Sequence, residues 1–287
     1  MMVFVPYHVS GVWLPIQGAN PVDSGSIGVG ILLSSGVTIS TIPRKGFRRL
    51  ELDPTTERVL EIMDVDRGFA ESLWIREERP LGYGYGASAS RALALALAIE
   101  VIKGRGSLCR AGEVAHVAEV VCGSGLGDVI AEAMGMGIVA RIKHGPPCRG
   151  VVDSFVPRKR YAIVTLPLGR MTTREMHEVY GERIRRVARS YIDRFLENPS
   201  IETFLEVSKG FSRDVGFLDR VTEERVLQAL RRYLSQGLAM GFFIKKKLLT
   251  VVAEPSAASE IGESLAGVMG VEPSIDLLGT RRAVVEI

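Results

Sequence analysis

The sequence contains few cysteine and histidine residues. Its three cysteines, Cys109, Cys122 and Cys148, have no C-x-x-C spacing, and its four histidines are widely scattered. An odd number of cysteines without such spacing argues against a disulfide framework and against a structural zinc site. We therefore expect a fold that is held together by a hydrophobic core, which a chain of 287 residues is long enough to build.

The sequence also lacks a long hydrophobic run. Its most apolar stretch, residues 92–99, is ended by Glu100, whereas a helix needs about 20 residues to cross a bilayer. The first residues, MMVFVPYHVSG, have no basic start followed by an apolar run and a small-residue cleavage site. We expect a soluble, cytoplasmic protein with no membrane partner.

Neither sign of charge is in large excess. The 36 basic and 33 acidic residues leave a net charge of +3, whereas a nucleic-acid-binding protein usually has a pI above about 9 and a concentrated basic stripe. We therefore expect no nucleic-acid partner. Short basic runs are typical of solvated faces and strand ends. The alternative stays open that one of these runs attracts an anionic small substrate. They occur at residues 44–49, 158–160, 183–189 and 245–247.

Two common nucleotide-binding motifs are missing. The Gly-Lys dipeptide of the ordinary P-loop occurs nowhere in the chain. Residues 84–89 fit the G-x-G-x-x-A pattern of a dinucleotide-binding fold, but residues 77–80 make a poor preceding strand. No acidic residue ends a second strand about 20 residues further on. The sequence therefore disfavours both folds.

The order of the expected elements predicts an α+β fold. The first half should contain a strand at residues 3–5, a hairpin over residues 27–41 that turns at the Ser-Ser-Gly of residues 34–36, and an apolar buried helix over residues 88–103. The second half alternates strands and helices. At roughly 150 residues per domain, we predict two domains, residues 1–157 and 158–287. Further elements are expected at residues 50–53, 55–64, 111–121, 128–134, 137–142, 161–166, 173–197, 223–236, 242–253, 255–270 and 283–287.

Glycine is abundant and clustered at residues 25–30, 82–86 and 123–127. The middle cluster, PLGYGYGASAS over residues 80–90, runs directly into the buried helix. Glycine lets a backbone approach a ligand closely, and a helix N-terminus offers free N–H groups and a partial positive charge, so that the two together suit a phosphate group. The other interpretation is a tight turn with a helix cap, because Ser88 and Ser90 are both good N-caps.

Two acidic residues accompany the third glycine cluster. Glu119 lies on the expected helix over residues 111–121 among apolar neighbours, and Asp128 follows the loop GSGLG. One carboxylate is suited to hold magnesium while another orients or deprotonates an alcohol. The alternatives are that Asp128 caps the following helix and that Glu119 is an acid on a helix surface.

At these positions the sequence resembles the GHMP kinase superfamily. The phosphate loop of that family, P-x-x-x-G-L-G-S-S-A, is similar to PLGYGYGASA over residues 80–89. Within the superfamily the closer resemblance is to the archaeal pantoate kinases. It is carried by PYHVSG over residues 6–11, SGSIGVG over residues 24–30, HVAEV over residues 116–120 and GLGDV over residues 125–129.

The resemblance implies a two-domain GHMP kinase architecture. The N-terminal, ATP-binding domain would be like domain 2 of ribosomal protein S5, the C-terminal domain would be ferredoxin-like, and the active site would lie between them. It implies ATP-dependent phosphorylation of the 4-hydroxyl group of (R)-pantoate to 4-phosphopantoate in coenzyme A biosynthesis, with ATP and Mg²⁺ as cofactors. A homodimer is common in the superfamily and is one expectation here, and a monomer stays open as the alternative.

The same resemblance assigns roles to residues. Asp128 would accept or orient the proton of the acceptor hydroxyl, and Ser88 and Glu119 would hold Mg²⁺. Arg141 is the candidate for the pantoate carboxylate, because a guanidinium binds a carboxylate bidentately; the other interpretation is a surface arginine at a strand end. The expected ATP-binding residues are Pro80, Gly82, Gly84, Tyr85, Gly86, Ala87, Ser88, Ala89 and Ser90. The expected substrate-binding residues are His8, Ser10, Ser24, Ser26, Arg141 and Thr173.

The sequence departs from the family pattern at three positions. In the phosphate loop, Ala87 replaces a serine and Tyr85 replaces the leucine. His8 stands where many members of the superfamily have lysine, which favours the pantoate branch. Three other functions stay open at this point. They are a GHMP kinase for another small hydroxylated acceptor such as homoserine or mevalonate, a non-catalytic nucleotide-binding member, and an RNA-binding protein.

Overall fold

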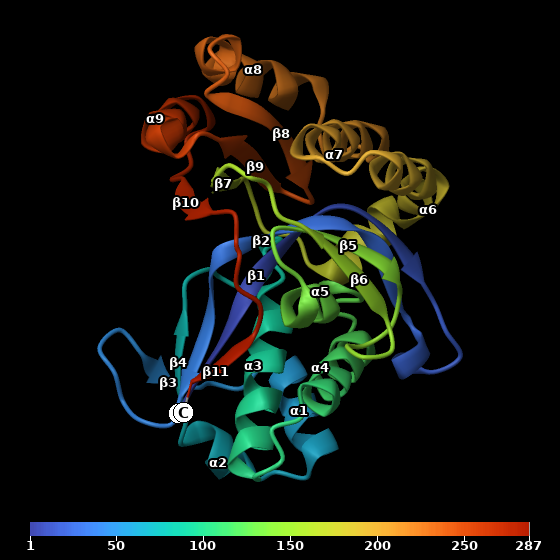
Figure 1. Cartoon of the computed structure of the whole chain (residues 1–287), viewed down its shortest axis with the longest axis vertical. Helices are drawn as coiled ribbons and strands as arrows, with labels where there is room; N and C mark the ends of the chain where they lie inside the picture. Colours follow the sequence, from blue (N-terminus) through green and yellow to red (C-terminus); the bar gives the residue numbers. More distant parts are fainter. Residues whose placement is uncertain (287) are drawn as a thin grey trace.

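The computed structural model describes residues 1–286, which form two β-sheets with helices packed against each of them (Figure 1). The first sheet has seven strands with two long central ones, β1 and β2. Both β4 and β5 pair with the outer edge of β2, at opposite ends of that strand. The strands are β1 (Met2–Ile16), β2 (Gly25–Ser40), β3 (Arg48–Arg49), β4 (Trp74–Glu77), β5 (Ile138–Lys143), β6 (Val151–Phe155) and β11 (Val284–Glu286).

The hairpin that was expected within residues 27–41 is wrong, because β2 runs unbroken through Ser34. The pairing of β1 with β2 shifts register between Pro6, opposite Gly36, and His8, opposite Leu32. The Ser-Ser-Gly interruption therefore marks a bulge in a long strand. Such bulges bend a strand and re-aim its side chains, and here the bulge lies next to His8.

One face of the first sheet is covered by five helices (Figure 1). The apolar helix α3 lies at their centre and is buried on nearly all sides, as its sequence predicted. α1 begins at the predicted place, where the side chain of Asp53 accepts hydrogen bonds from the backbone N–H groups of Thr55 and Thr56. The helices are α1 (Pro54–Met63), α2 (Arg67–Glu71), α3 (Ala87–Ile102), α4 (Leu108–Cys122) and α5 (Asp128–Met134), and η1 (Pro21–Asp23) is a short 3-10 turn.

The second sheet has the order β10-β7-β9-β8 and is antiparallel throughout. Its chain order is β-α-β-β-α-β, as in ferredoxin-like units, with three helices between its first two strands. The strands are β7 (Ala162–Pro167), β8 (Ala239–Lys245), β9 (Leu248–Ala253) and β10 (Ser274–Leu277). The helices are α6 (Thr173–Glu197), α7 (Ile201–Val215), α8 (Arg220–Ser235) and α9 (Ala258–Met269), and η2 (Pro255–Ala257) precedes α9. The order of these strands and helices confirms the predicted α+β class.

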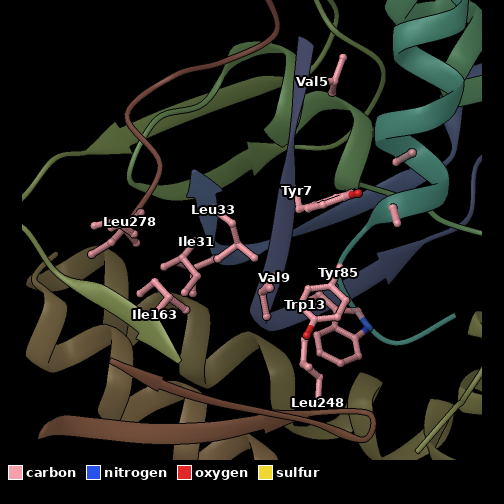
Figure 2. Packing of buried hydrophobic residues seen from close by; sticks show 14 of the residues in the cluster. Val5, Tyr7, Val9, Trp13, Ile31, Leu33, Tyr85, Ile163, Leu248 and Leu278 are labelled. Carbon is pink, nitrogen blue, oxygen red and sulfur yellow. The ribbon is translucent and has the colours of Figure 1, made fainter. Parts of the chain in front are cut away.

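The two sheets share one hydrophobic core. Figure 2 shows Ile31 and Leu33 of β2 near Ile163 of β7 and Leu278, which follows β10, and all four belong to the same buried cluster. α6 and α7 also pack against β1, and α7 packs against β8. The strand expected at residues 283–287 is present as β11, but it returns to the first sheet and pairs with β1; Ile287 lies outside the described residues.

A disulfide bond corrects the expectation from the cysteine count. Cys109, in the first turn of α4, is bonded to Cys148, in the loop between β5 and β6, and Cys122 is free. The two cysteines are separated by 39 residues, so no local spacing signalled the pair. Among residues 1–286, no helix is both long enough and apolar enough to span a membrane.

Candidate active site

The loop over residues 80–86 leads from β4 to α3, and glycine gives it its shape. Gly82, Gly84 and Gly86 have φ angles of 86°, 94° and 73°, in the left-handed region that glycine adopts at little cost. Gly86 is the N-cap of α3, and no side chain caps this helix in the described chain. The interpretation of Ser88 or Ser90 as a helix cap is therefore wrong, and the first N–H groups of α3 stay available to an anion.

This loop forms one wall of a cleft of about 510 Å³. The cleft is also lined by Glu119, Asp128 and residues 53–55, at the start of α1. Lys245 and Lys246 reach it from the second sheet. The cleft is therefore lined by residues from both halves of the chain, among them carboxylates and two lysines.

Ser88 and Glu119 meet at one end of the cleft. The Ser88 hydroxyl donates to Glu119 Oε1 at 2.5 Å, and the Ser124 hydroxyl donates to the same oxygen at 2.6 Å. Burial raises the pKa of Glu119 to about 7, although the two hydroxyl groups oppose the shift. A buried carboxylate beside a hydroxyl is a set of hard oxygen donors, and Mg²⁺ prefers such donors.

Asp128 begins α5, directly after its N-cap Gly127. The alternative in which Asp128 itself caps the helix is therefore wrong. Its Oδ1 atom lies 2.7 Å from His8 Nδ1 and 3.8 Å from Lys245 Nζ, and its side chain keeps 19% exposure to the cleft. Burial alone would raise the pKa of Asp128, but Lys245, His8 and Arg141 outweigh it and hold the pKa well below its usual value. Asp128 is therefore ionised near pH 7.

His8 lies behind Asp128 and is fully buried. Burial lowers the pKa of His8 to about 4 despite the neighbouring carboxylate, so that the ring is neutral near pH 7. We assign its proton to Nδ1, which then donates to Asp128, and leave Nε2 to accept from Arg141 Nη1 at 3.4 Å. His8 thus fixes the orientation of the Asp128 carboxylate.

Arg141 lies in β5 with only 1% of its surface exposed, so its interpretation as a surface arginine is wrong. Its Nη1 atom donates to Ser10 Oγ at 3.3 Å. Its Nε atom is buried and has no hydrogen-bond partner among residues 1–286. An unpaired buried guanidinium edge is costly to maintain, and it is the arrangement that a carboxylate ligand would satisfy.

Arg141 lines a second, smaller pocket that adjoins the cleft at Asp128. The expected substrate-binding residues Ser10, Ser26 and Thr173 also line it, together with Trp13, Met176 and His177. This acceptor pocket therefore combines a cation and hydroxyl groups on one side with apolar side chains on the other.

Not every expected residue faces a pocket. Ser24 turns its hydroxyl to Asn20 O, at 3.1 Å, and its carbonyl to His116 Nε2, at 3.0 Å, because it closes the loop between β1 and β2. Ser90 donates to Pro6 O at 3.0 Å and so ties α3 to β1, Ala89 is packed in the core, and Pro80 lies outside the cleft. The cleft is lined by Gly82, Gly84, Tyr85, Gly86, Ala87 and Ser88.

Sequence analysis missed several residues of the site. Lys245 belongs to a basic run that was interpreted first as a solvated strand end, yet it is 5% exposed. The weaker interpretation, in which one run attracts an anionic substrate, fits Lys245 and Lys246. Lys246 Nζ donates to Thr173 Oγ1 at 3.0 Å, and burial together with Lys245 lowers its pKa to about 8. The only signal in the sequence was the position of the run within an expected hairpin.

No family model matches this chain. Among curated proteins, the pantoate kinase of Thermococcus kodakarensis is 29% identical over 271 residues, which cover 88% of each chain. The solved structure of a phosphotransferase related to the CoA biosynthesis pathway is 26% identical and has a TM-score of 0.78. It covers 100% of this chain and 99% of its own.

A third comparison concerns the fold alone. Mevalonate-3-kinase from Thermoplasma acidophilum, solved with mevalonate 3-phosphate and ADP bound, has a TM-score of 0.64 at 12% identity. The match covers 98% of this chain and 97% of that one. The likeness therefore extends over both sheets and the cleft between them.

Proposed function

We propose that this small-molecule kinase phosphorylates the 4-hydroxyl group of (R)-pantoate in coenzyme A biosynthesis. The expected resemblance to the GHMP kinases and to archaeal pantoate kinases is confirmed. The observation that carries the proposal is the position of Asp128. It lines both the cleft beside the glycine loop and the pocket that contains the unpaired edge of Arg141. A phosphoryl donor and a hydroxy acid bound in these two hollows would meet at its carboxylate.

The chemistry assigned to this site is a single phosphoryl transfer. The acceptor oxygen forms a bond to the γ-phosphorus of ATP, the bond from that phosphorus to the bridging oxygen breaks, and ADP leaves with the bonding electrons. The hydroxyl proton passes to Asp128. Such transfers depend on positioning and charge neutralisation more than on covalent catalysis. The backbone of Gly84 and Gly86 and the N-terminus of α3 would hold the triphosphate.

Mg²⁺ fits the donor set of Ser88 and Glu119. Among residues 1–286, no group of three or more histidine, cysteine or acidic side chains converges into a metal cage. Mg²⁺ that accompanies a nucleotide is usually bound by one or two protein ligands together with phosphate oxygens and water, so a hydroxyl and one carboxylate are sufficient. When bound, the ion neutralises charge on the triphosphate.

Pantoate has a carboxylate, a 2-hydroxyl group and two methyl groups near the 4-hydroxyl group. The acceptor pocket offers Arg141 Nε for the carboxylate, Ser10 and Ser26 for the 2-hydroxyl, and Trp13 and Met176 for the methyl groups. This match supports pantoate over an acceptor that lacks a carboxylate.

We infer that the protein acts in the cytoplasm, where ATP and Mg²⁺ are available. The expected homodimer stays a prediction, and light scattering during size-exclusion chromatography would test it. Residues 1–157 and 158–287 stay our proposed domains, with the qualification that β11 belongs to the first sheet.

The deciding experiment measures ADP release with ATP and Mg²⁺ in the presence of pantoate, homoserine, mevalonate or no acceptor, and identifies the phosphorylated product by mass spectrometry. We expect release that requires pantoate. Release with another acceptor would replace the substrate and keep the reaction. If a folded sample binds ATP and releases no ADP with any acceptor, the non-catalytic alternative is correct.

The Arg141→Lys variant sharpens this assay. Lysine keeps the charge and loses the planar guanidinium edge. We expect the KM for pantoate to rise by about tenfold or more, as for a lost charge-assisted contact, while the KM for ATP stays unchanged. The exposed Arg149 in the following loop provides the matched control, Arg149→Lys. A rise in the KM for ATP alone would place Arg141 on the nucleotide.

A further inference from the structure

The cleft and the acceptor pocket share four residues, and two of them are lysines. Asp128, Thr173, Lys245 and Lys246 line both hollows. A phosphoryl group that moves from the cleft to the acceptor pocket passes these four side chains. Asp128 receives the proton in the proposed function, whereas no role has yet been given to Lys245.

The segment that carries the lysines is a rigid hairpin tip from the second sheet. Lys245 is the last residue of β8, and β9 begins at Leu248. Before the tip, the Ser212 hydroxyl of α7 donates to Ile244 O at 2.7 Å and accepts from Ile244 N at 3.1 Å. After it, Leu168 N donates to Lys247 O at 2.8 Å. The turn is therefore fixed on both sides.

Lys246 adopts a conformation that few residues with side chains adopt. Its φ angle is 58°, in the left-handed region that costs a residue other than glycine about 1–2 kcal/mol. Such strain persists where the surrounding structure imposes it, and it is concentrated at functional sites. Here it lets two consecutive lysines both point into the cleft, as their shared place in the lining shows.

Lys245 is a buried cation whose hydrogen bonds are not used up. Its side chain is 6% exposed and its Nζ atom lies 3.8 Å from Asp128 Oδ1, beyond the 2.7–2.9 Å of a direct charge-assisted hydrogen bond. In the described chain its ammonium donates to no oxygen atom at hydrogen-bond distance. Burial lowers the pKa of Lys245, and Arg141 adds to this, while Asp128 opposes it. An anionic oxygen beside Asp128 would satisfy this ammonium.

We infer that Lys245 is a catalytic residue that binds the γ-phosphoryl group of the nucleotide and stabilises the negative charge on it during transfer. The inference rests on the proposed function, which supplies ATP as the donor, the acceptor hydroxyl group and the role of Asp128. In the balanced step, the γ-phosphorus exchanges its bond to ADP for a bond to the acceptor oxygen, and Asp128 takes the proton. Lys245 keeps its own proton throughout and contacts a non-bridging oxygen of the phosphoryl group.

The test compares Lys245→Met and Lys245→Arg with Lys247→Met. Lys247 lies in the same turn but is exposed, so its variant controls for changes to the hairpin. Calorimetry measures the affinity for Mg–ADP and for a non-hydrolysable ATP analogue, and turnover is measured with ATP and the active acceptor. Thermal melting confirms that each variant is folded.

For Lys245→Met we expect the affinity for ADP to stay unchanged. The affinity for the analogue should weaken by about tenfold or more. The kcat should fall by about 10²-fold, as for loss of one preorganised donor. Lys245→Arg should recover part of both, and Lys247→Met should match the wild type. If Lys245→Met bound both ADP and the analogue as tightly as the wild type does, the inference would be wrong. So would a rise in the KM for the acceptor alone. The two binding measurements need no acceptor, so they decide the role of Lys245 even if the wild type proves inactive towards pantoate.

Discussion

Two carboxyl groups in the cleft have environments that move their pKa values in opposite directions. Burial raises the pKa of Glu119 to about 7, whereas the cations and His8 around Asp128 outweigh burial and hold its pKa well below the usual value. Pairs of groups separated in this way mark distinct chemical roles. Asp128 stays ionised, as the proton acceptor that we propose must be. Glu119 reaches its ionised form most readily beside a cation, which supports the proposal that it holds Mg²⁺.

The first prediction concerns Asp128 itself. In Asp128→Asn the amide keeps the shape of the side chain and a hydrogen bond to His8, but it cannot take the acceptor proton. We expect kcat to fall by about 10²–10⁴-fold, the usual contribution of general acid–base catalysis, with unchanged affinity for ATP. Steady-state kinetics and calorimetry measure the two quantities.

The exposed Asp153 of β6 supplies the control for that prediction. It pairs in register with Ala140 of β5, next to Arg141, so Asp153→Asn makes the same chemical change outside the pocket. We expect wild-type kinetics from it. If Asp128→Asn retained its turnover, Asp128 would lose its role in proton transfer.

At the scale of elements, the phosphate loop depends on how closely its backbone can approach its surroundings. A β-carbon on Gly86 would lie 2.6 Å from Glu132 Oε1 and 3.0 Å from the backbone oxygen of His8. The backbone oxygen cannot move aside as a flexible side chain can. Glycine is therefore required at position 86 for two reasons. Its φ angle lies in the left-handed region, and a β-carbon there would collide with the backbone of β1.

The second prediction separates these two requirements with glycines at opposite ends of α3. Gly86 and Gly104 have nearly the same φ angles, 73° and 74°, but a β-carbon on Gly104 would meet nothing within 4 Å. Gly104→Ala should lower the free energy of unfolding by about 1–2 kcal/mol, the cost of the left-handed conformation, and leave ATP affinity unchanged. Gly86→Ala should lose more stability than this and also lose affinity for ATP.

Denaturant melts and calorimetric ATP titrations of both variants provide the comparison. Equal losses of stability would mean that only the φ angle matters at Gly86. Wild-type ATP affinity in Gly86→Ala would mean that the loop does not hold the phosphate groups.

Local signals predicted the helices better than the strands. α1 lies within one residue of its predicted bounds, and α6 spans the predicted residues 173–197, because capping and helical periodicity act within a few residues. β4, β6, α7 and β10 were not predicted, and the break at Ser34 was interpreted as a turn. The pairing of a strand is decided by partners that are distant in the sequence, so a bulge and a turn look alike there.

The same difference between local signals and distant contacts decided which residues of the candidate site were predicted. Asp128, Glu119 and Ser88 were found because family motifs surround them in the sequence. Lys245 enters the site only because the second sheet turns its hairpin towards the first, and Ser124 only because the loop before α5 folds back on Glu119. No spacing in the sequence records those approaches.

At the scale of the whole molecule, the chain crosses between the two sheets twice. It leaves the first sheet after β6, and it returns after β10 to add β11 beside β1. Arg79 also pairs with Asp276 of β10 at 2.6 Å, with both side chains largely buried. The two sheets are therefore joined by covalent connections, a shared core and an ion pair, which keeps the hairpin tip of Lys245 in place over the cleft.

The disulfide adds a third kind of connection, within the first half of the chain. It joins α4, which carries Glu119, to the loop that follows Arg141 in β5. Closing a loop with a separation of 39 residues typically stabilises a protein by about 2–4 kcal/mol, mainly by restricting the unfolded chain. The bond therefore stabilises the half of the molecule in which Glu119 and Arg141 lie.

The last prediction is that reduction lowers the melting temperature of the wild type by several degrees, since each kcal/mol is worth about 2–4 °C in proteins approaching this size. A variant with both Cys109→Ser and Cys148→Ser should melt at the reduced temperature whether or not a reductant is present. Cys122→Ser should behave like the wild type in both conditions, because its thiol is free. Alkylation of the unfolded, unreduced protein should label Cys122 alone. Labelling of all three cysteines, with melting unaffected by the reductant, would show that Cys109 and Cys148 remain thiols and that packing alone holds the loop to α4.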